Sequence, residues 1–465
     1  MSTDQKAARG ARLAVARVTI QALTPFVVGT GGGDDLRDSV CVSDANGLPT
    51  IPGSSIAGVL RHALAAGEDP DRHPDCRELF GYQERNEGAS SRLEVSWAQV
   101  HDEDDRPVPF RGARLSKLLA FLATGVERDH VRLNARGAVD GKGKFDETLV
   151  PTGARFTFEL IIEDPGEGEL ERILGLLARP ELRLGGRSRR GFGAFELVRV
   201  RSRVFDLRKP DDRKAWAALP RALHEDAPSL PLASKPASAG GDMARLVVEL
   251  EPEDYWIFGG GVPIGVEGAR ERDPDILPVT EECVVWDKAG NGEKGRVGER
   301  RRLVPASSVK GALRHRTAFH ARRLAGAWAD PEMEGAEPAE VAEVVELFGD
   351  ANSSDGRGTP GRVYLRDVYL KGTSTTSAST VSPVRRWTGC SSAKRRCSVR
   401  RGSSSSRSWS SARRSRPAPR RRSAPRSTTW SRAGSRLARE PTAGTATSRA
   451  ALEVTCEHRR SPSAE

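Results

Sequence analysis

The chain has 465 residues, of which 37% are hydrophobic and 29% charged, which is enough for two or three domains with their own cores. This composition excludes a disordered or fibrous protein as a description of the whole chain. The formal net charge of +11 suggests a nucleic-acid binder, but residues 379–465 alone hold 21 Arg and Lys against four Glu, so the remainder carries −6. The net charge by itself therefore identifies no ligand.

The first predicted elements fall within residues 1–208. Apolar periodicity predicts, in chain order, a strand, a helix, two strands, a helix and a strand, at residues 13–23, 54–66, 92–100, 155–163, 169–178 and 193–200. The order β-α-β-β-α-β is the ferredoxin-like (RRM-like) pattern. We therefore expect an α+β fold for this first domain.

A repeat predicts a second domain of the same kind. The sequence PGSSIAGVLRH at residues 52–62 recurs as PASSVKGALRH at residues 305–315, and Glu-Leu-Phe-Gly follows both copies. Between them, the stretch rich in Pro, Ser and Gly at residues 209–242 is typical of an interdomain linker. Two tandem domains are therefore expected, the second one at residues 243–372.

The repeated motif places two serines where a helix begins. Their hydroxyl groups can cap backbone N–H groups or bind a phosphate, and both interpretations stay open. A glycine four residues after the first serine lets another backbone come close, and an arginine follows about two turns along the same face. The candidate residues of this motif are Ser54, Ser55, Arg61, Ser307, Ser308 and Arg314.

A second basic element, LGGRSRRGFG at residues 184–193, lies between a predicted helix and a predicted strand. Dinucleotide and Walker motifs need the order strand, loop, helix, and no GxxxxGK[ST] sequence occurs, which argues against a mononucleotide cofactor. Closely spaced glycines let a backbone approach a ligand, and arginines neutralise phosphates, whereas a solvated basic turn is the alternative. The candidate residues are Gly185, Gly186, Arg187, Arg189 and Arg190.

This combination resembles the RAMP superfamily of CRISPR-associated proteins, which pairs a ferredoxin-like domain with a PGSS-x-x-G-x-L-R helix start and a Gly/Arg-rich loop after the second helix. The chain is most similar to the guide-RNA-binding backbone subunits of type III effector complexes, here as a fused pair. The resemblance implies CRISPR RNA and target RNA as ligands, other type III effector subunits as partners and antiviral defence as the role. Lys310 keeps the basic residue usual in the helix motif, whereas Ala57 replaces it and Ala306 replaces the usual glycine.

The resemblance also implies a target-cleaving aspartate in the loop between the first strand and the first helix. Asp38 and Asp275 are the candidates, acting with Mg²⁺ or another divalent cation, while the 2′-hydroxyl of the RNA supplies the nucleophile. An ordinary role as loop residues is the alternative. Neighbouring carboxylates that compete for the assignment are Asp34, Asp35, Asp44 and Asp273.

Other functions stay open. One is a structural subunit that binds RNA without cleaving it, and another is a guide-processing endonuclease of the same superfamily, in which His62 or His315 would be the candidate. A generic ferredoxin-like binding module is disfavoured by the arginine cluster. His62, His73 and Cys76 lie in one segment, but no second pair of ligands follows, so zinc is not expected.

Residues 130–153 resemble the hairpin that wedges into the guide–target duplex in this family, and an exposed loop is the alternative.

The Ser/Arg-rich composition of residues 373–465 predicts a disordered tail. An RNA-binding tail is one interpretation. A shifted reading frame is favoured, because reading GC-rich codons two bases later can restore Ala-Val-Asp-Gly and a Pro-Ala-Gly-strand order like that at residues 138–163. The second domain as written is therefore expected to be incomplete.

A cytoplasmic location is expected. No apolar run reaches the roughly 18 residues of a membrane span, and residues 1–12 are polar. The six cysteines form no CxxC pair and do not resemble a disulfide framework.

Overall fold

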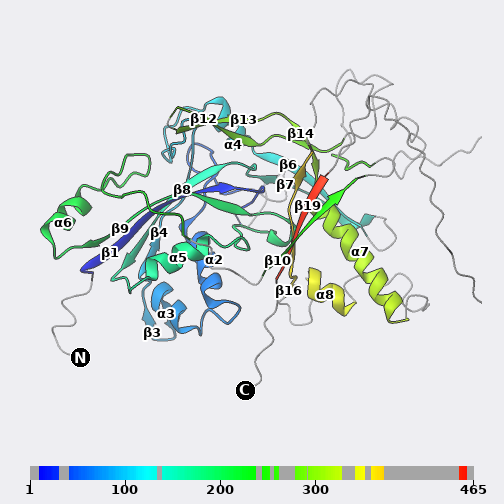
Figure 1. Ribbon diagram of the computed structural model, residues 1–465, viewed down its shortest axis with the longest axis horizontal. Helices are drawn as coiled ribbons and strands as arrows, with labels where there is room; N and C mark the ends of the chain where they lie inside the picture. The colour runs from blue at the N-terminus through cyan, green and yellow to red at the C-terminus, as the bar shows by residue number, and fades with distance from the viewer. Residues whose placement is uncertain are drawn as a thin grey trace, which may run out of the picture. The chain divides into compact units, whose positions relative to one another are not determined.

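The computed structural model describes ten segments of the chain, all within the same structural unit, at residues 10–30, 41–133, 139–236, 243–251, 256–260, 278–290, 292–326, 341–350, 358–370 and 450–457. Figure 1 shows their helices and strands. In the described part, no helix is both long enough and apolar enough to cross a membrane.

The first half of the chain forms an antiparallel sheet with the strand order β4-β8-β1-β9, and β5 also pairs with β8. The strands are β1 (Arg12–Ala22), β4 (Leu93–Val95), β5 (Gln99–Val100), β8 (Arg155–Glu163) and β9 (Phe195–Asp206). Helices α2 (Gly53–Ala65) and α5 (Glu169–Leu177) connect them. The chain order matches the β-α-β-β-α-β order predicted for this domain.

One face of this sheet carries the main core. In β1, Ala16, Val18 and Ile20 are buried in the same cluster as Leu60 of α2 and Ile173 of α5. These core positions alternate along β1 because successive side chains of a strand point to opposite faces, and the residues between them are buried on the other face. Truncating a buried leucine such as Leu60 to Ala costs about 2–5 kcal/mol, so this packing holds α2 and α5 against the sheet.

The opposite face is covered at one end by the segment predicted to be a linker, which differs from that prediction. The described part of this segment, residues 209–236, contains α6 (Pro210–Ala217) and buries Leu230 against Phe205 of β9. Arg17, which is 6% exposed, donates from Nη1 to the backbone carbonyl of Ala222 at 3.4 Å. Its apolar residues explain the difference, because they complete a core that β1 and β9 leave open.

The second half forms a smaller sheet with the order β10-β19-β17, made of β10 (Met243–Leu250), β17 (Val363–Leu365) and β19 (Ala450–Glu457). Strand β19 lies between β10 and β17 in this sheet, as β8 lies between β1 and β4 in the first sheet. Helix α7 (Ala306–Leu324) follows β10 in the chain as α2 follows β1. Among the described residues, no element takes the places of α5 and β9.

Strand β19 corrects part of the tail prediction. Residues 373–465 were expected to be disordered, but Ala450–Glu457 pair with β10 over eight positions, and residues 371–449 lie outside the described part. The sequence AALEVTCE alternates apolar and polar residues, which is a strand pattern. A sheet edge left open by β10 and β17 gives such a segment a pairing partner.

A hairpin from the second half packs on the first. It consists of β12 (Val284–Ala289) and β13 (Gly292–Val297). Trp286 donates from Nε1 to the carbonyl of Gly153 at 2.8 Å, and Arg155 lies 4.1 Å above the Trp286 ring. The two halves therefore share buried contacts within one unit.

The remaining elements are short or lie at the rim, at α3 (Pro74–Phe80), β2 (Tyr82–Glu84), β3 (Glu87–Ala89), α4 (Lys117–Thr124), β6 (Val126–Leu133), β7 (Val139–Leu149), η1 (Ser188–Arg190), β11 (Thr280–Glu281), β14 (Arg301–Val304), α8 (Ala342–Phe348), β15 (Gly349–Asp350), β16 (Thr359–Pro360) and β18 (Val368–Tyr369).

Candidate nucleic-acid interface

The Gly/Arg loop, residues 184–193, joins the region after α5 to β9 and turns back on itself. Gly185 has φ +79° and a Cβ there would lie 2.1 Å from the carbonyl oxygen of Val27, so only glycine fits. Arg187 adopts φ +56°, and Ser188–Arg190 form the single 3₁₀ turn η1. This backbone holds three arginines on one short turn.

The Gly/Arg loop contacts the beginning of α7. Lys310 donates from Nζ to the backbone carbonyl of Arg189 at 2.7 Å. A Cβ on Gly191, whose φ is +103°, would lie 2.6 Å from the Cβ of Ala306 and 2.7 Å from the carbonyl oxygen of Leu365. Two sequence motifs, one from each half of the chain, therefore form one surface.

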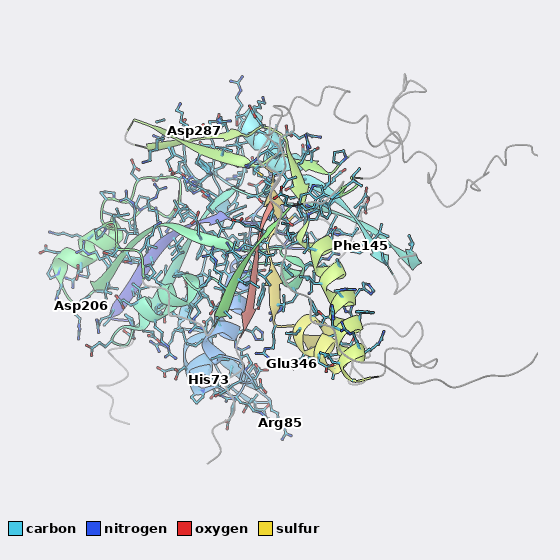
Figure 2. The ribbon with its side chains drawn as sticks, turned by 45° about the vertical axis from the view of Figure 1, so that its right-hand side comes forward. His73, Arg85, Phe145, Asp206, Asp287 and Glu346 are labelled. Atoms are coloured by element: carbon cyan, nitrogen blue, oxygen red, sulfur yellow. The ribbon has the colours of Figure 1, made fainter. Side chains whose placement is uncertain are left out.

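Aromatic rings hold the arginine side chains of this surface. The guanidinium groups of Arg187 and Arg190 each lie 5.0 Å from the ring centre of Phe145 in β7, while Arg189 lies 4.1 Å from that of Tyr364 in β17. Arg187 also forms an ion pair with the buried carboxylate of Glu147. Phe145, labelled in Figure 2, pairs with His130 in the β6–β7 hairpin.

The electrostatics of this surface indicate an excess of positive charge. Burial, followed by repulsion from Arg189, Arg314 and Arg190, lowers the pKa of Lys310 to about 8. Burial, followed by repulsion from Arg366, lowers the pKa of Arg183 to about 10. Cationic groups that repel one another in a partly desolvated place are stabilised by an added anion. A phosphate group is an anion with the right geometry for arginine.

The serines of the repeated motif do not cap their helices. Proline occupies the cap position of both α2 and α7, and neither helix has a side-chain cap from these serines. In α7 the first amide, that of Ala306, instead donates to Asp367 Oδ1 at 2.7 Å. The capping interpretation is therefore wrong for Ser54, Ser55, Ser307 and Ser308.

The exchange of glycine for alanine at the motif's second position has a packing reason. A Cβ on Gly53 would lie 2.0 Å from the carbonyl oxygen of Val95, so α2 tolerates no side chain there. At the equivalent position of α7, the methyl group of Ala306 meets Gly191 instead. Each contact therefore contains one glycine, which is Gly53 of the helix itself in α2 and Gly191 of the facing loop in α7.

The glycines in the middle of both motifs face open space. A Cβ on Gly58 or on Gly311 would have no atom within 4 Å, apart from its own helix backbone and chain neighbours. Glycine inside a helix costs about 1 kcal/mol relative to alanine. No packing contact within the described residues therefore requires these two glycines.

The basic residues of the two helices differ in their surroundings. Arg61 of α2 forms an ion pair with Asp71, with Nη2 and Oδ1 2.7 Å apart. Arg314 of α7 is half-buried and contributes to the repulsion felt by Lys310. The structure thus brings Lys310 and Arg314 together with the Gly/Arg loop of the first half, and it engages Arg61 separately.

A buried ionic group links the β6–β7 hairpin to the second half. Arg128, which is 6% exposed, forms ion pairs of 2.7 Å with Glu281 and with Asp367, and Tyr369 donates to Glu281 at 2.7 Å. These charges neutralise one another out of water. Sequence reasoning missed this group, because its members are far apart in the chain and match no motif.

The segment predicted as a hairpin, residues 130–153, overlaps the antiparallel pair β6–β7, which begins at Val126 and ends at Leu149. Its side chains Val131, Leu133 and Val139 are about half exposed. At its base, His130 Nε2 lies 2.9 Å from Glu147 Oε1. Burial, then repulsion from Arg190 and Arg128, lowers the pKa of His130 to about 4.

The candidate catalytic aspartates, Asp38 and Asp275, lie outside the described residues. Their neighbour Asp44 is described, and its Oδ1 accepts from the amides of Asn46 at 2.8 Å and Leu48 at 2.9 Å, which makes it a turn residue. Within the described segments, no group of three or more His, Cys, Asp and Glu side chains is arranged to hold a metal ion.

Comparison with known proteins agrees with the motifs. Residues 19–196 match the model of the RAMP superfamily, so this part of the chain is a RAMP superfamily domain, and that superfamily is associated with CRISPR-Cas systems. The match runs from β1 into β9 and includes the Gly/Arg loop. No curated protein sequence matches the chain.

Proposed function

We propose that this protein is an RNA-binding subunit of a type III CRISPR effector, with two ferredoxin-like RAMP domains in tandem, that holds CRISPR RNA in antiviral defence. One observation carries the proposal. The Gly/Arg loop of the first domain rests on the beginning of α7, where Lys310 is surrounded by like charges. Such a surface is suited to the phosphates of an RNA strand.

In this proposal each motif residue has a separate contribution. Gly186, whose Cβ position is open, lets the RNA backbone approach the loop, and Gly311 does the same on α7. The side chains of Arg189, Arg190 and Lys310 supply the positive charge. The hydroxyls of Ser307 and Ser308, which are not used as caps, add neutral hydrogen bonds to phosphate or ribose.

The repeat extends the proposal to partner subunits. Helix α2 carries the same motif as α7, but within the described residues no Gly/Arg loop rests on its first turn. Ser54 there is exposed, and Gly58 faces open space. We expect the corresponding loop of another type III effector subunit to occupy this surface, which would continue the arrangement head to tail.

RNA binding is tested with the full chain and a CRISPR RNA at increasing salt concentrations. Replacing Arg189 or Arg190 with Ala should weaken binding and reduce the slope of log affinity against log salt by about 1 for each phosphate that the variant no longer binds. Arg72→Ala is the matched control, because its side chain is 89% exposed and lies far from the loop in sequence. Equal affinity and slope for all three variants would contradict the proposal.

Target cleavage is a second part of the proposal. Asp38 and Asp275 would each bind a divalent cation or transfer a proton while the ribose 2′-hydroxyl attacks the adjacent phosphate. This attack would form a 2′,3′-cyclic phosphate and break the bond to the 5′-oxygen of the next nucleotide, which leaves as a hydroxyl. Asp38→Ala combined with Asp275→Ala should abolish cleavage of paired target RNA and leave guide binding intact. Undiminished cleavage rejects these residues, and absence of cleavage by the unmodified chain favours a structural subunit.

A guide-processing endonuclease is the competing function. Such an enzyme would trim precursor guide RNA without any target RNA. His62 is exposed on α2, and His315 is half-buried on α7. Trimming that is lost in His62→Ala or His315→Ala would favour this alternative over the effector subunit.

A further inference from the structure

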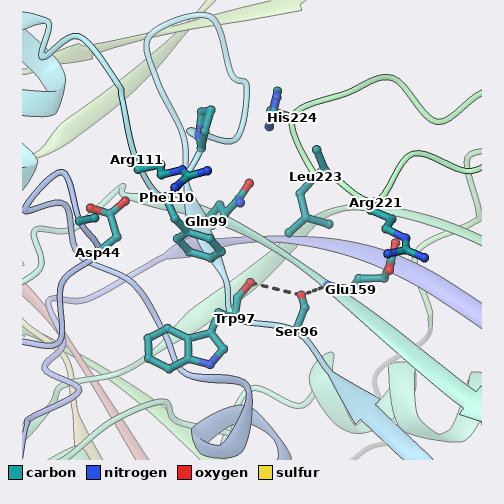
Figure 3. Close-up of a pocket in the computed structure, with 13 residues that line it drawn as sticks. Asp44, Ser96, Trp97, Gln99, Phe110, Arg111, Glu159, Arg221, Leu223 and His224 are labelled. Atoms are coloured by element: carbon teal, nitrogen blue, oxygen red, sulfur yellow. Dashed lines mark hydrogen bonds between the residues drawn. The ribbon is translucent and has the colours of Figure 1, made fainter.

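A cavity of about 670 Å³ opens on the first domain, away from the Gly/Arg loop. It lies on the sheet face opposite α2 and α5, because Glu159 lines it while its neighbours Phe158 and Leu160 are buried in the helix-side core. Figure 3 shows its lining, which is Asp44, Ala45, Ser96, Trp97, Gln99, Pro109, Phe110, Arg111, Glu159, Arg221, Ala222, Leu223 and His224.

The floor of the cavity contains an unsatisfied amide. Gln99 lies on β5 opposite Thr157 of β8 and is 7% exposed, and its Oε1 atom is buried without a hydrogen-bond partner. In Figure 3 its amide points into the space between Arg111 and Leu223. A buried acceptor without a donor is costly to a fold, so a donor from a ligand is a physical reason to keep it.

Aromatic and apolar side chains form the walls. Trp97, which is 48% exposed, and Phe110 and Leu223 line the cavity, and in Figure 3 the Phe110 ring lies between the Trp97 indole and the Gln99 amide. Aromatic rings and a hydrogen-bonding amide that line one cavity suit a flat heteroaromatic ring, which can stack and donate at once.

Two exposed arginines, Arg111 and Arg221, stand at the rim of the cavity. Neither forms an ion pair with a described carboxylate. The carboxylate of Glu159, which also lines the cavity, is paired with Arg17 at 2.8 Å. Positive charge at the rim is therefore available to an anion attached to the ring.

We propose that this cavity binds one unpaired nucleotide, with its base stacked on Phe110 and donating a hydrogen bond to Gln99 Oε1, and its phosphate held by one arginine of the rim, Arg111 or Arg221. The volume lies within the range of about 300–1,000 Å³ usual for small-ligand sites. The nucleotide is either part of a bound RNA or free. Only the first source rests on the proposed RNA-binding function.

The test uses the full chain, the four nucleoside 5′-monophosphates and five-nucleotide homopolymers of RNA, with tryptophan fluorescence as the readout. Quenching that disappears in Trp97→Phe assigns the signal to this site. Homopolymers that bind more than tenfold tighter than the monophosphates identify RNA as the source, and equal affinity identifies a free nucleotide.

Two glutamine variants decide the role of the amide. Gln99→Leu should weaken binding about tenfold or more without lowering the thermal unfolding midpoint, because leucine fills the space and removes the unsatisfied acceptor. Gln83→Leu, at an exposed glutamine of β2, is the control and should change neither. The proposal is overturned if Gln99→Leu binds as well as the unmodified chain, or if no probe quenches Trp97.

The nucleotide site can be distinguished from the α7 surface. Lys310→Met should reduce the affinity for long RNA and leave the binding of monophosphates to the cavity unchanged. If long RNA does not depend on Lys310 while monophosphates still bind, the proposed RNA-binding surface fails and the cavity stands. If long RNA depends on Lys310 and the monophosphates do not bind, the proposed nucleotide site is rejected and the RNA-binding surface stands.

Discussion

Replacing Lys310 with Met separates a ligand-binding lysine from one that merely joins two parts of the fold. Methionine keeps the apolar stem of the side chain and removes the charge. The variant also removes the hydrogen bond from Nζ to the carbonyl of Arg189, which is 2.7 Å long. The two effects act on folding with opposite signs.

The magnitude follows from the pKa. A pKa of about 8, compared with the ordinary 10.5, means that charging Lys310 costs the folded chain about 3 kcal/mol, at 1.36 kcal/mol for each pH unit. A hydrogen bond from a charged donor contributes about 1.5–3 kcal/mol. Lys310→Met should therefore change the free energy of unfolding at pH 7 by no more than about 1–2 kcal/mol, toward greater stability.

Chemical denaturation at pH 7 and pH 10 measures this balance. Between pH 8 and 10.5 the unfolded chain holds a proton that the folded chain has released, so the unmodified protein gains stability as pH rises and Lys310→Met does not. RNA affinity of the unmodified protein should fall above about pH 8. Lys288→Met, at an exposed lysine, is the control. A variant that loses 2 kcal/mol or more and binds RNA normally would refute the reasoning.

Three further predictions concern stability. Gly311→Ala should stabilise the protein by about 1 kcal/mol, because its Cβ meets open space. Gly53→Ala should destabilise the protein, because the new Cβ would lie 2.0 Å from a backbone oxygen, and thermal unfolding measures both effects. Acidification from pH 6.5 to 4 should lower the free energy of unfolding by about 1–2 kcal/mol through His130, because its lowered pKa lets the unfolded chain take up the proton first. In denaturant titrations, His130→Phe should lose this pH dependence. Arg128→Met should destabilise by about 3–5 kcal/mol by leaving buried carboxylates such as Asp367 without their partner, and recovery in Arg128→Met with Asp367→Asn would support that cause.

Periodicity was sufficient to predict the main sheet. The strand over Arg12–Ala22 and the helix over Gly53–Ala65 follow from local patterns, because each buries one face against the same core. The covering segment around α6 was predicted as a linker, since its prolines and serines obscure the few apolar residues that pack. Strand β19 was missed because its partner β10 lies about 200 residues earlier in the chain.

The candidate site was predicted residue by residue, but its assembly was not. The sequence identified Arg189 and Lys310 as basic candidates, and only the structure shows that the loop of one half rests on the helix of the other. Gln99 carries no sequence signal, because an unsatisfied amide is recognised only from what surrounds it. Asp38 and Asp275 stay predictions, since they lie outside the described residues.

The pairing of β10 with β19 has a consequence for the order of events during synthesis. All strands of the first sheet lie before Lys209, so that sheet can form while the rest of the chain is still being made. The second sheet must wait until Glu457 emerges, and closing so long a loop is slow. Helix α7 is made in between and meets an already folded Gly/Arg loop, so the first domain acts as a template on which the second is assembled.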